Sequence, residues 1–131
     1  TFIGGTLLNL TRLGTAFSEK SSAILDAKFS DSPLSILVLA IFCGILMFTA
    51  VEGFARSKNS GNHPASLFLV IIPVMVFILC GFNHCVADMA YFFISRCHRL
   101  DAAPVYFLFV IIGNAIGCML IPMMKKLSLN N

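Results

Sequence analysis

Long apolar runs alternate with short polar stretches along this chain. Three such runs cover residues 33–52, 65–94 and 104–124. A helix needs about 20 mostly apolar residues to cross a bilayer, so each run predicts a membrane-spanning helix. Pro33 suits the first turn of its helix, where a missing backbone N–H leaves no hydrogen bond unmade. The polar stretches 56–64 and 96–101 predict connecting loops.

The second run contains polar residues that a simple membrane span does not need. Asn83, His84 and Asp88 lie within it, and ionisable groups at membrane depth usually face a cavity, a partner or a substrate path. The run also carries Pro73 and Gly81, both of which weaken a helix. Two interpretations are open: a helix broken at mid-membrane, as in many transporters, or one tilted helix with a proline kink.

The start of the chain is apolar but too short to cross a bilayer. Residues 1–14 lack the basic start and the cleavage site of a signal peptide. We expect them to be the last turns of a helix that begins upstream, which would make the chain the C-terminal part of a single larger membrane domain. Residues 2–8 weakly resemble residues 111–117, and both contain small residues that let helices pack closely. If both are third helices of a three-helix repeat, an upstream half precedes this chain.

Composition supports an integral membrane protein built of helices. Hydrophobic residues make up 58% of the 131 residues and charged residues 11%, against about 25% charged in a soluble domain. The mean hydropathy is +0.91. Because the chain has 13 Phe and no Trp, Tyr91 and Tyr106 are its only amphipathic ring anchors for the membrane interface. The net charge of +3 is spread over short loops, which argues against a nucleic-acid partner.

The cysteines do not point to a cofactor. No two of them form a CxxC pair, so neither a zinc site nor a dithiol redox centre is predicted. Three lie well inside apolar runs, where a thiol behaves as a small hydrophobic group. We therefore expect no metal and no cofactor. The five are Cys43, Cys80, Cys85, Cys97 and Cys118.

One alternative function would require a cofactor. His84 and His98 lie fourteen positions apart, which would stack two axial haem ligands on one helix face. The chain would then be a membrane haem-binding subunit for electron transfer. Arg96, Arg99 and Asp101 surround His98, however, so His98 belongs to a predicted exposed bend, which weakens this alternative.

Four landmarks, in order, resemble one family of membrane proteins. Gly81-Phe82-Asn83-His84-Cys85-Val86-Ala87-Asp88-Met89 resembles the Gly-Phe-Glu-His-x-(Val/Ile)-Ala-Asn-Met motif in the fifth helix of the formate/nitrite transporter family. Ile72-Pro73-Val74-Met75-Val76-Phe77 resembles the Leu-Pro-Val-x-x-Phe that precedes this motif. Ile112-Gly113-Asn114-Ala115-Ile116-Gly117 resembles the Ile-Gly-Asn-x-x-Gly of the sixth helix. Ala27-Lys28, ahead of a span that starts with proline, resembles the Lys before the fourth helix.

The resemblance implies an all-α integral membrane fold of the aquaporin-like, inverted-repeat kind. Family members have six helices in two inverted halves, the second and fifth helices are broken, and five protomers, each with its own pore, form a homopentamer. This chain would supply about three and a half transmembrane helices of a multi-pass protein of the cell membrane. They are the end of helix three (1–14), helix four (33–52), a broken helix five (65–94) and helix six (104–124).

The resemblance also implies roles for individual residues. His84 would be the central pore histidine, Asn114 its polar neighbour, and Phe77 part of a hydrophobic constriction on the cytoplasmic side. Lys28 would be the cation near the outer vestibule, and Phe82 joins the pore or substrate-binding candidates. Without the motifs, simpler interpretations hold: a helix-packing histidine, an Asn114 that bonds across helices, a lipid-facing or core Phe77 and a snorkelling Lys28.

Two residues depart from the family motif. Asn83 stands where the family has Glu, which removes a group that could orient the imidazole. Asp88 stands where the family has Asn, which puts a negative charge beside an anion path. Either Asp88 pairs with Lys28, or burial keeps Asp88 protonated and neutral. We include both residues among the pore candidates and expect Asp88 to modify selectivity or the response to pH.

The resemblance implies a transporter and not an enzyme, with small monovalent anions of weak acids as substrates: formate, nitrite or hydrosulfide. Loss of water raises the pKa of such an acid, so the anion can take up a proton and cross a dry constriction as the neutral acid. A histidine can donate a hydrogen bond, hold charge or relay that proton. Transport would be channel-like or proton-coupled. A further alternative is a structural half-transporter that does not conduct, because the other broken helix of the pore is not in this chain.

Overall fold

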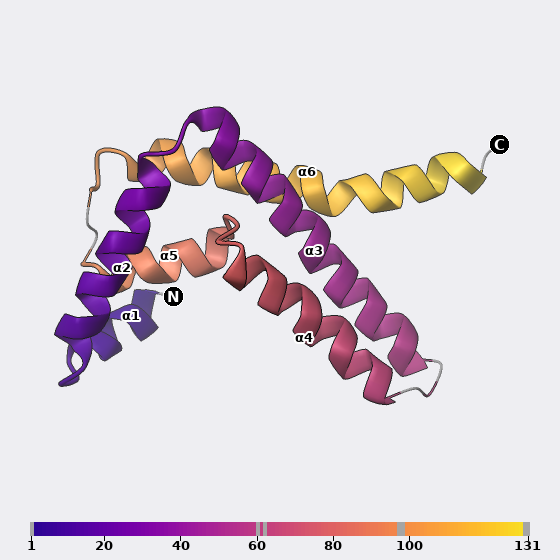
Figure 1. The fold of residues 1–131 in the computed structure, drawn as a ribbon, viewed down its shortest axis with the longest axis horizontal. Helices are drawn as coiled ribbons and strands as arrows, with labels where there is room; N and C mark the ends of the chain where they lie inside the picture. The colour runs from indigo at the N-terminus through magenta and orange to yellow at the C-terminus, as the bar shows by residue number, and fades with distance from the viewer. Residues whose placement is uncertain (1, 60, 62, 97–98, 130–131) are drawn as a thin grey trace.

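The computed structural model describes residues 2–59, 61, 63–96 and 99–129, and every regular element within them is a helix. Figure 1 shows how these helices are arranged. They are α1 (Phe2–Asn9), α2 (Gly14–Phe29), α3 (Pro33–Asn59), α4 (His63–Leu79), α5 (Cys85–Ile94) and α6 (Ala103–Leu129).

Two helices are long and apolar enough to cross a membrane. Both α3 and α6 have 27 residues, which at about 1.5 Å per residue exceeds the roughly 30 Å of a bilayer core. The apolar helices α4 and α5 have 17 and 10 residues, so neither reaches across alone. They follow one another on either side of a short break in the chain.

The helices form two groups that meet at this break (Figure 1). In the first group, α4 returns antiparallel along α3, and α6 crosses α3 at about its middle. In the second group, α5 packs against α1 and α2. The break between α4 and α5 therefore lies at the centre of the structure, close to where α3 and α6 cross.

Small residues allow α3 and α6 to touch. A Cβ atom added at Gly44 would collide with the backbone of Asn114, and one added at Gly117 would collide with the carbonyl of Ile41. At Gly113, an added Cβ would lie 2.6 Å from the Cβ of Ala40. Helices in lipid associate through such close packing, since hydrophobicity alone does not hold them together. The predicted close approach at residues 113–117 is thus present, with α3 as the partner.

A small apolar core contrasts with a large exposed apolar surface. The core joins Leu25 of α2 and Phe92 of α5 to Tyr106 and Val110 of α6. Outside it, large apolar side chains on α4 and α6 point outward. Soluble monomers rarely expose contiguous apolar patches above a few hundred Å². The exposed residues include Leu67, Phe68, Ile72, Met75, Leu108, Ile112, Met119 and Leu127.

Several helix boundaries differ from those predicted. The first helix ends at Asn9 instead of continuing to residue 14. Helix α3 extends past residue 52 to Asn59, because Glu52 and Arg56 form an ion pair one turn apart at 2.6 Å and support the helix into the predicted loop. Helix α6 similarly extends to Leu129. The second span occupies α4 and α5 with an interruption, so the proline-kink interpretation is wrong: Pro73 lies inside an unbroken α4.

Helix α2 was not predicted at all. Its sequence mixes polar residues such as Ser18, Glu19 and Lys20 with few apolar ones, so it shows neither a membrane span nor a strong apolar face. Only Gly14, Ser21 and Leu25 are buried in it. This helix carries Lys28 towards the break.

Candidate functional site

The break between α4 and α5 begins at a glycine. Gly81 has φ of +67°, a left-handed conformation that residues with a side chain adopt at a cost. The N–H of Phe82 still donates to the carbonyl of Phe77, 3.0 Å away, and the extended residue His84 then starts α5. Because the helical ladder stops here, nearby backbone groups need partners from elsewhere in the molecule.

His84 caps the new helix. Its Nδ1 accepts a hydrogen bond from the N–H of Ala87 at 3.2 Å, so a side chain replaces a missing turn of helix. Since Nδ1 is the acceptor, a neutral imidazole in this position carries its proton on Nε2. The ring also stacks on Phe77 with 5.3 Å between the ring centroids. His84 is thereby held in one orientation, with the donor nitrogen pointing away from the cap.

Asn114 of α6 braces both sides of the break. Its Oδ1 accepts from the N–H of Cys85 at 3.0 Å. Its Nδ2 donates to the carbonyls of Ala40 and Asn83, both at 2.9 Å. Both amide hydrogens are thus used, and the residue links α3, the break and α5. The cross-helix bonding that sequence alone left open for Asn114 is present.

A buried ion pair joins three helices beside the break. The Lys28 ammonium lies 2.7 Å from Oδ1 of Asp88 and donates to the carbonyl of Phe82 at 3.3 Å. The hydroxyl of Tyr106 donates to Oδ2 of Asp88 at 2.8 Å. Asp88 is 1% exposed and lies in the first turn of α5, where the helix dipole favours a negative charge. Of the two expectations for Asp88, pairing with Lys28 is confirmed.

Phe82 and Asn83 face inward at the break. Asn83 is 1% exposed, and its Nδ2 donates to the carbonyl of Ile36 at 3.2 Å. Within the described part of the chain, its Oδ1 meets no hydrogen-bond donor. Phe82 stacks on Phe42 of α3, with ring centroids 5.9 Å apart. Asn83 therefore supports the backbone here and is covered by protein.

A cavity of about 200 Å³ opens beside the ion pair. Lys28 and Asp88 supply its charged groups, and Phe77 and Phe82 supply aromatic walls. Phe77 thus lines the cavity and also stacks on His84. Among the residues described, two of the three ammonium N–H groups of Lys28 have acceptors, so the third is available to a small polar guest.

Tyr106 is the residue that sequence reasoning misplaced. It was predicted to anchor at the membrane interface, but it is 2% exposed and its hydroxyl bonds to Asp88. The interfacial role is therefore wrong for Tyr106. A signal was available: a tyrosine among many phenylalanines places one polar atom in an apolar helix, and a buried hydroxyl needs a partner.

The haem alternative gains nothing from this geometry. Cys97 and His98 lie outside the described residues, so the structure places only one of the two proposed ligands. The Nδ1 of that ligand, His84, accepts from the N–H of Ala87, so a neutral imidazole in this position carries its proton on Nε2, which then has no lone pair for an iron.

Comparison with known proteins agrees with the motifs. The profile of a family described as formate/nitrite transporter matches residues 1–127. Members of that family are transporters and not enzymes, and the two long apolar helices fit a multi-pass membrane protein. Comparison with curated proteins and with solved structures finds no significant match. The chain belongs to the formate/nitrite transporter family, as the resemblance predicted.

Proposed function

We propose that this protein carries small monovalent anions of weak acids across the cell membrane, with formate, nitrite and hydrosulfide as the candidate substrates. Family membership suggests anion transport of this kind. The observation that carries the proposal is the broken helix: Lys28, Asp88 and Phe77 line one cavity beside it, and His84 stacks on Phe77 next to that cavity. A membrane protein that carries no polar substrate would have no need of ionisable side chains at the break in an apolar segment.

The proposed assembly is an aquaporin-like inverted repeat, with one pore in each protomer of a homopentamer. In it, α3 serves as helix four, α4 and α5 together as the broken helix five, and α6 as helix six. The apolar surface of α4 and α6 supports this proposal, because neighbouring helices and lipid would cover it.

The proposed entry step uses the Lys28–Asp88 pair as a neutral polar site. Asp88 balances the ammonium charge, so the cavity binds a guest through a hydrogen bond more than through net attraction. The anion of a weak acid that sheds water here becomes more basic, because desolvation disfavours its charged form. It takes up a proton from the water at the cavity mouth, passes on as the neutral acid, and releases the proton when it reaches water again.

The proposed passage step follows the aromatic wall to the histidine. Phe77 excludes water from the path and orients His84 by stacking. The Nε2–H of His84 then donates to an oxygen or sulfur of the guest. Asn114 and Tyr106 are positioning residues: they hold the break and the ion pair in place.

The test is flux into liposomes that contain the full-length protein. Formate, nitrite and hydrosulfide uptake would be measured over a pH series, with His84→Ala beside Val86→Ala as a matched control, since Val86 is 55% exposed on the same helix. We expect anion uptake by the His84 variant to be at least about tenfold slower, or to lose its dependence on pH. The reason is that the variant lacks the positioned imidazole that donates to the guest. The control should match the wild type.

Two outcomes would overturn the proposal. Absence of flux for all three anions in wild-type liposomes would rule out anion transport. Flux that is the same in the His84 and Val86 variants would remove His84 from the path. A Soret absorption band in the purified protein would instead revive the haem alternative.

A further inference from the structure

A second cavity lies away from the break, between α3 and α6. Its volume is about 320 Å³. Beyond the crossing of the two helices, α6 turns away from α3 and leaves this space open (Figure 1). Pro122, which removes one helical hydrogen bond, lies inside α6 at this point and lines the cavity.

The wall of this cavity changes from apolar to charged in the same direction on both helices. On α3, Phe48 comes first and is followed by Glu52 and Arg56. On α6, Ile121 is followed by Lys125. The cavity is therefore amphipathic. Helices that cross a bilayer change from apolar to charged where hydrocarbon gives way to headgroups, and α3 and α6 are the candidate spans.

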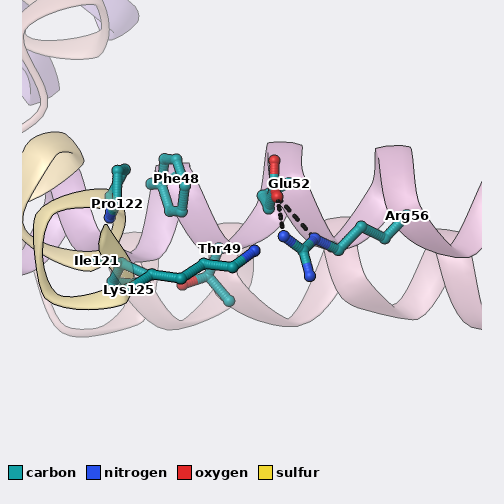
Figure 2. A pocket seen from close by; sticks show the side chains of 8 residues that line it. Phe48, Thr49, Glu52, Arg56, Ile121, Pro122 and Lys125 are labelled. Atoms are coloured by element: carbon teal, nitrogen blue, oxygen red, sulfur yellow. Dashed lines mark hydrogen bonds and ion pairs between the residues drawn. The ribbon is translucent and has the colours of Figure 1, made fainter. Parts of the chain in front are cut away.

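The charged end of the cavity is net positive. Arg56 and Glu52 form an ion pair at 2.6 Å, which engages Nε and one terminal nitrogen of the guanidinium. Figure 2 shows the Lys125 side chain extending from α6 towards this pair. Two basic groups and one acidic group leave one positive charge on the rim. Such a rim attracts a phosphate at the membrane surface.

We propose that this cavity binds an anionic phospholipid. An acyl chain and the glycerol lie against Phe48, Ile121 and Pro122, and the phosphate accepts hydrogen bonds from Lys125 and Arg56. A free phosphate ion would satisfy only the charged rim and leave the apolar wall uncovered. A phospholipid matches both parts in the order in which the wall presents them.

The test is lipid retention measured by native mass spectrometry on the full-length protein, titrated with phosphatidylglycerol or with phosphatidylcholine. We expect tighter retention of phosphatidylglycerol. Lys125→Gln should weaken it about fivefold, the equivalent of about 1 kcal/mol for one basic group at a membrane surface. Lys126→Gln is the matched control, because Lys126 has the same charge on the same helix and does not line the cavity. Glu52→Gln should strengthen retention.

Each contrary outcome overturns the proposal in its own way. Equal losses in the Lys125 and Lys126 variants would mean diffuse surface charge. Equal retention of the two lipids would mean an apolar groove without headgroup recognition. Displacement of the lipid by soluble glycerol phosphate would mean a phosphate site, and a change of oligomeric mass in the Lys125 variant would mean that protein occupies the cavity. Because the readout is lipid mass, the result does not depend on transport.

Discussion

The α3–α6 crossing and the α4–α5 break meet different demands within one small membrane protein. At the crossing both helices are continuous, their backbone groups bond within each helix, and Gly44 and Gly117 need only be small. At the break the ladder stops, and the side chains of His84, Asn114 and Lys28 bond the backbone instead. Polar residues are thus concentrated where the backbone is interrupted, and these same residues form the candidate site.

The largest expected effect is at the buried ion pair of the break. Asp88→Ala leaves the Lys28 ammonium without its counter-charge and the Tyr106 hydroxyl without its acceptor, and we expect a loss of about 4 kcal/mol in the free energy of unfolding. Glu52→Ala is the control, because its ion pair is exposed and should be worth about 0.5 kcal/mol or less. Equilibrium unfolding in detergent micelles measures both. If Asp88→Ala lowered the free energy of unfolding as little as Glu52→Ala, Lys28 would be solvated and not buried.

The next effect belongs to the crossing. Gly117→Val places methyl groups against the backbone of Ile41 and Gly44, which cannot move aside cheaply, and we expect a loss of about 3 kcal/mol. Gly4→Val on α1 is the control, since no atom lies within 4 Å of an added Cβ there. The same unfolding measurement applies. If the two variants are equally stable, α3 and α6 do not touch at this point.

Removal of the Asn114 hydrogen bonds at the break should lower the free energy of unfolding by less than Asp88→Ala or Gly117→Val does. Asn114→Leu keeps the side-chain size but leaves the N–H of Cys85 and the carbonyl of Asn83 without the partner that Asn114 supplies, for a loss of about 2 kcal/mol. Thr49→Val is the control, because within the described residues its hydroxyl bonds to the carbonyl of Ile45 in its own helix and does not bridge two helices. Hydrogen exchange should rise at Cys85 and Ala87 in the Asn114 variant. Unchanged exchange would contradict the bracing role.

The smallest expected effect on stability comes from backbone strain at Gly81. Gly81→Ala meets no neighbouring atom, so its cost should come only from the positive φ, about 1 kcal/mol. Gly4→Ala, within a helix and equally uncrowded, should instead stabilise by up to about 1 kcal/mol. Thermal unfolding of the two variants compares them directly. A neutral Gly81 variant would show that the break relaxes out of the left-handed conformation.

Much of the fold followed from the sequence, and the errors have physical causes. Continuous apolar runs identified the regions of α3 and α6, because a bilayer imposes length and hydrophobicity on any span. Helix α2 was missed because few of its residues are apolar, and it is held by contacts with α5 and by Lys28. The end of α3 was misplaced because polar residues, among them the paired Glu52 and Arg56, continue the helix beyond its apolar part.

The candidate site was predictable as a list but not as an arrangement. The motif around His84 and the family match identified which residues to consider. Partners came from distant parts of the chain: Lys28 lies 60 positions before Asp88, and Tyr106 lies 18 positions after it. The family resemblance offered the Lys28 pair as one of two alternatives for Asp88, whereas no local pattern indicated Tyr106 as a partner, and the interfacial role predicted for Tyr106 was wrong.

The sequence by itself determined that this is a helical membrane protein of the formate/nitrite transporter family, since hydropathy and motif are local properties of the chain. Only the tertiary structure decided that Asp88 pairs with Lys28. It also decided that the side-chain amide of Asn114 bonds to the backbone at the break, and that α3 and α6 line an amphipathic cavity. The reason is physical. Where a helix is interrupted or two helices diverge, the backbone and charged groups take whichever partners the packing brings near.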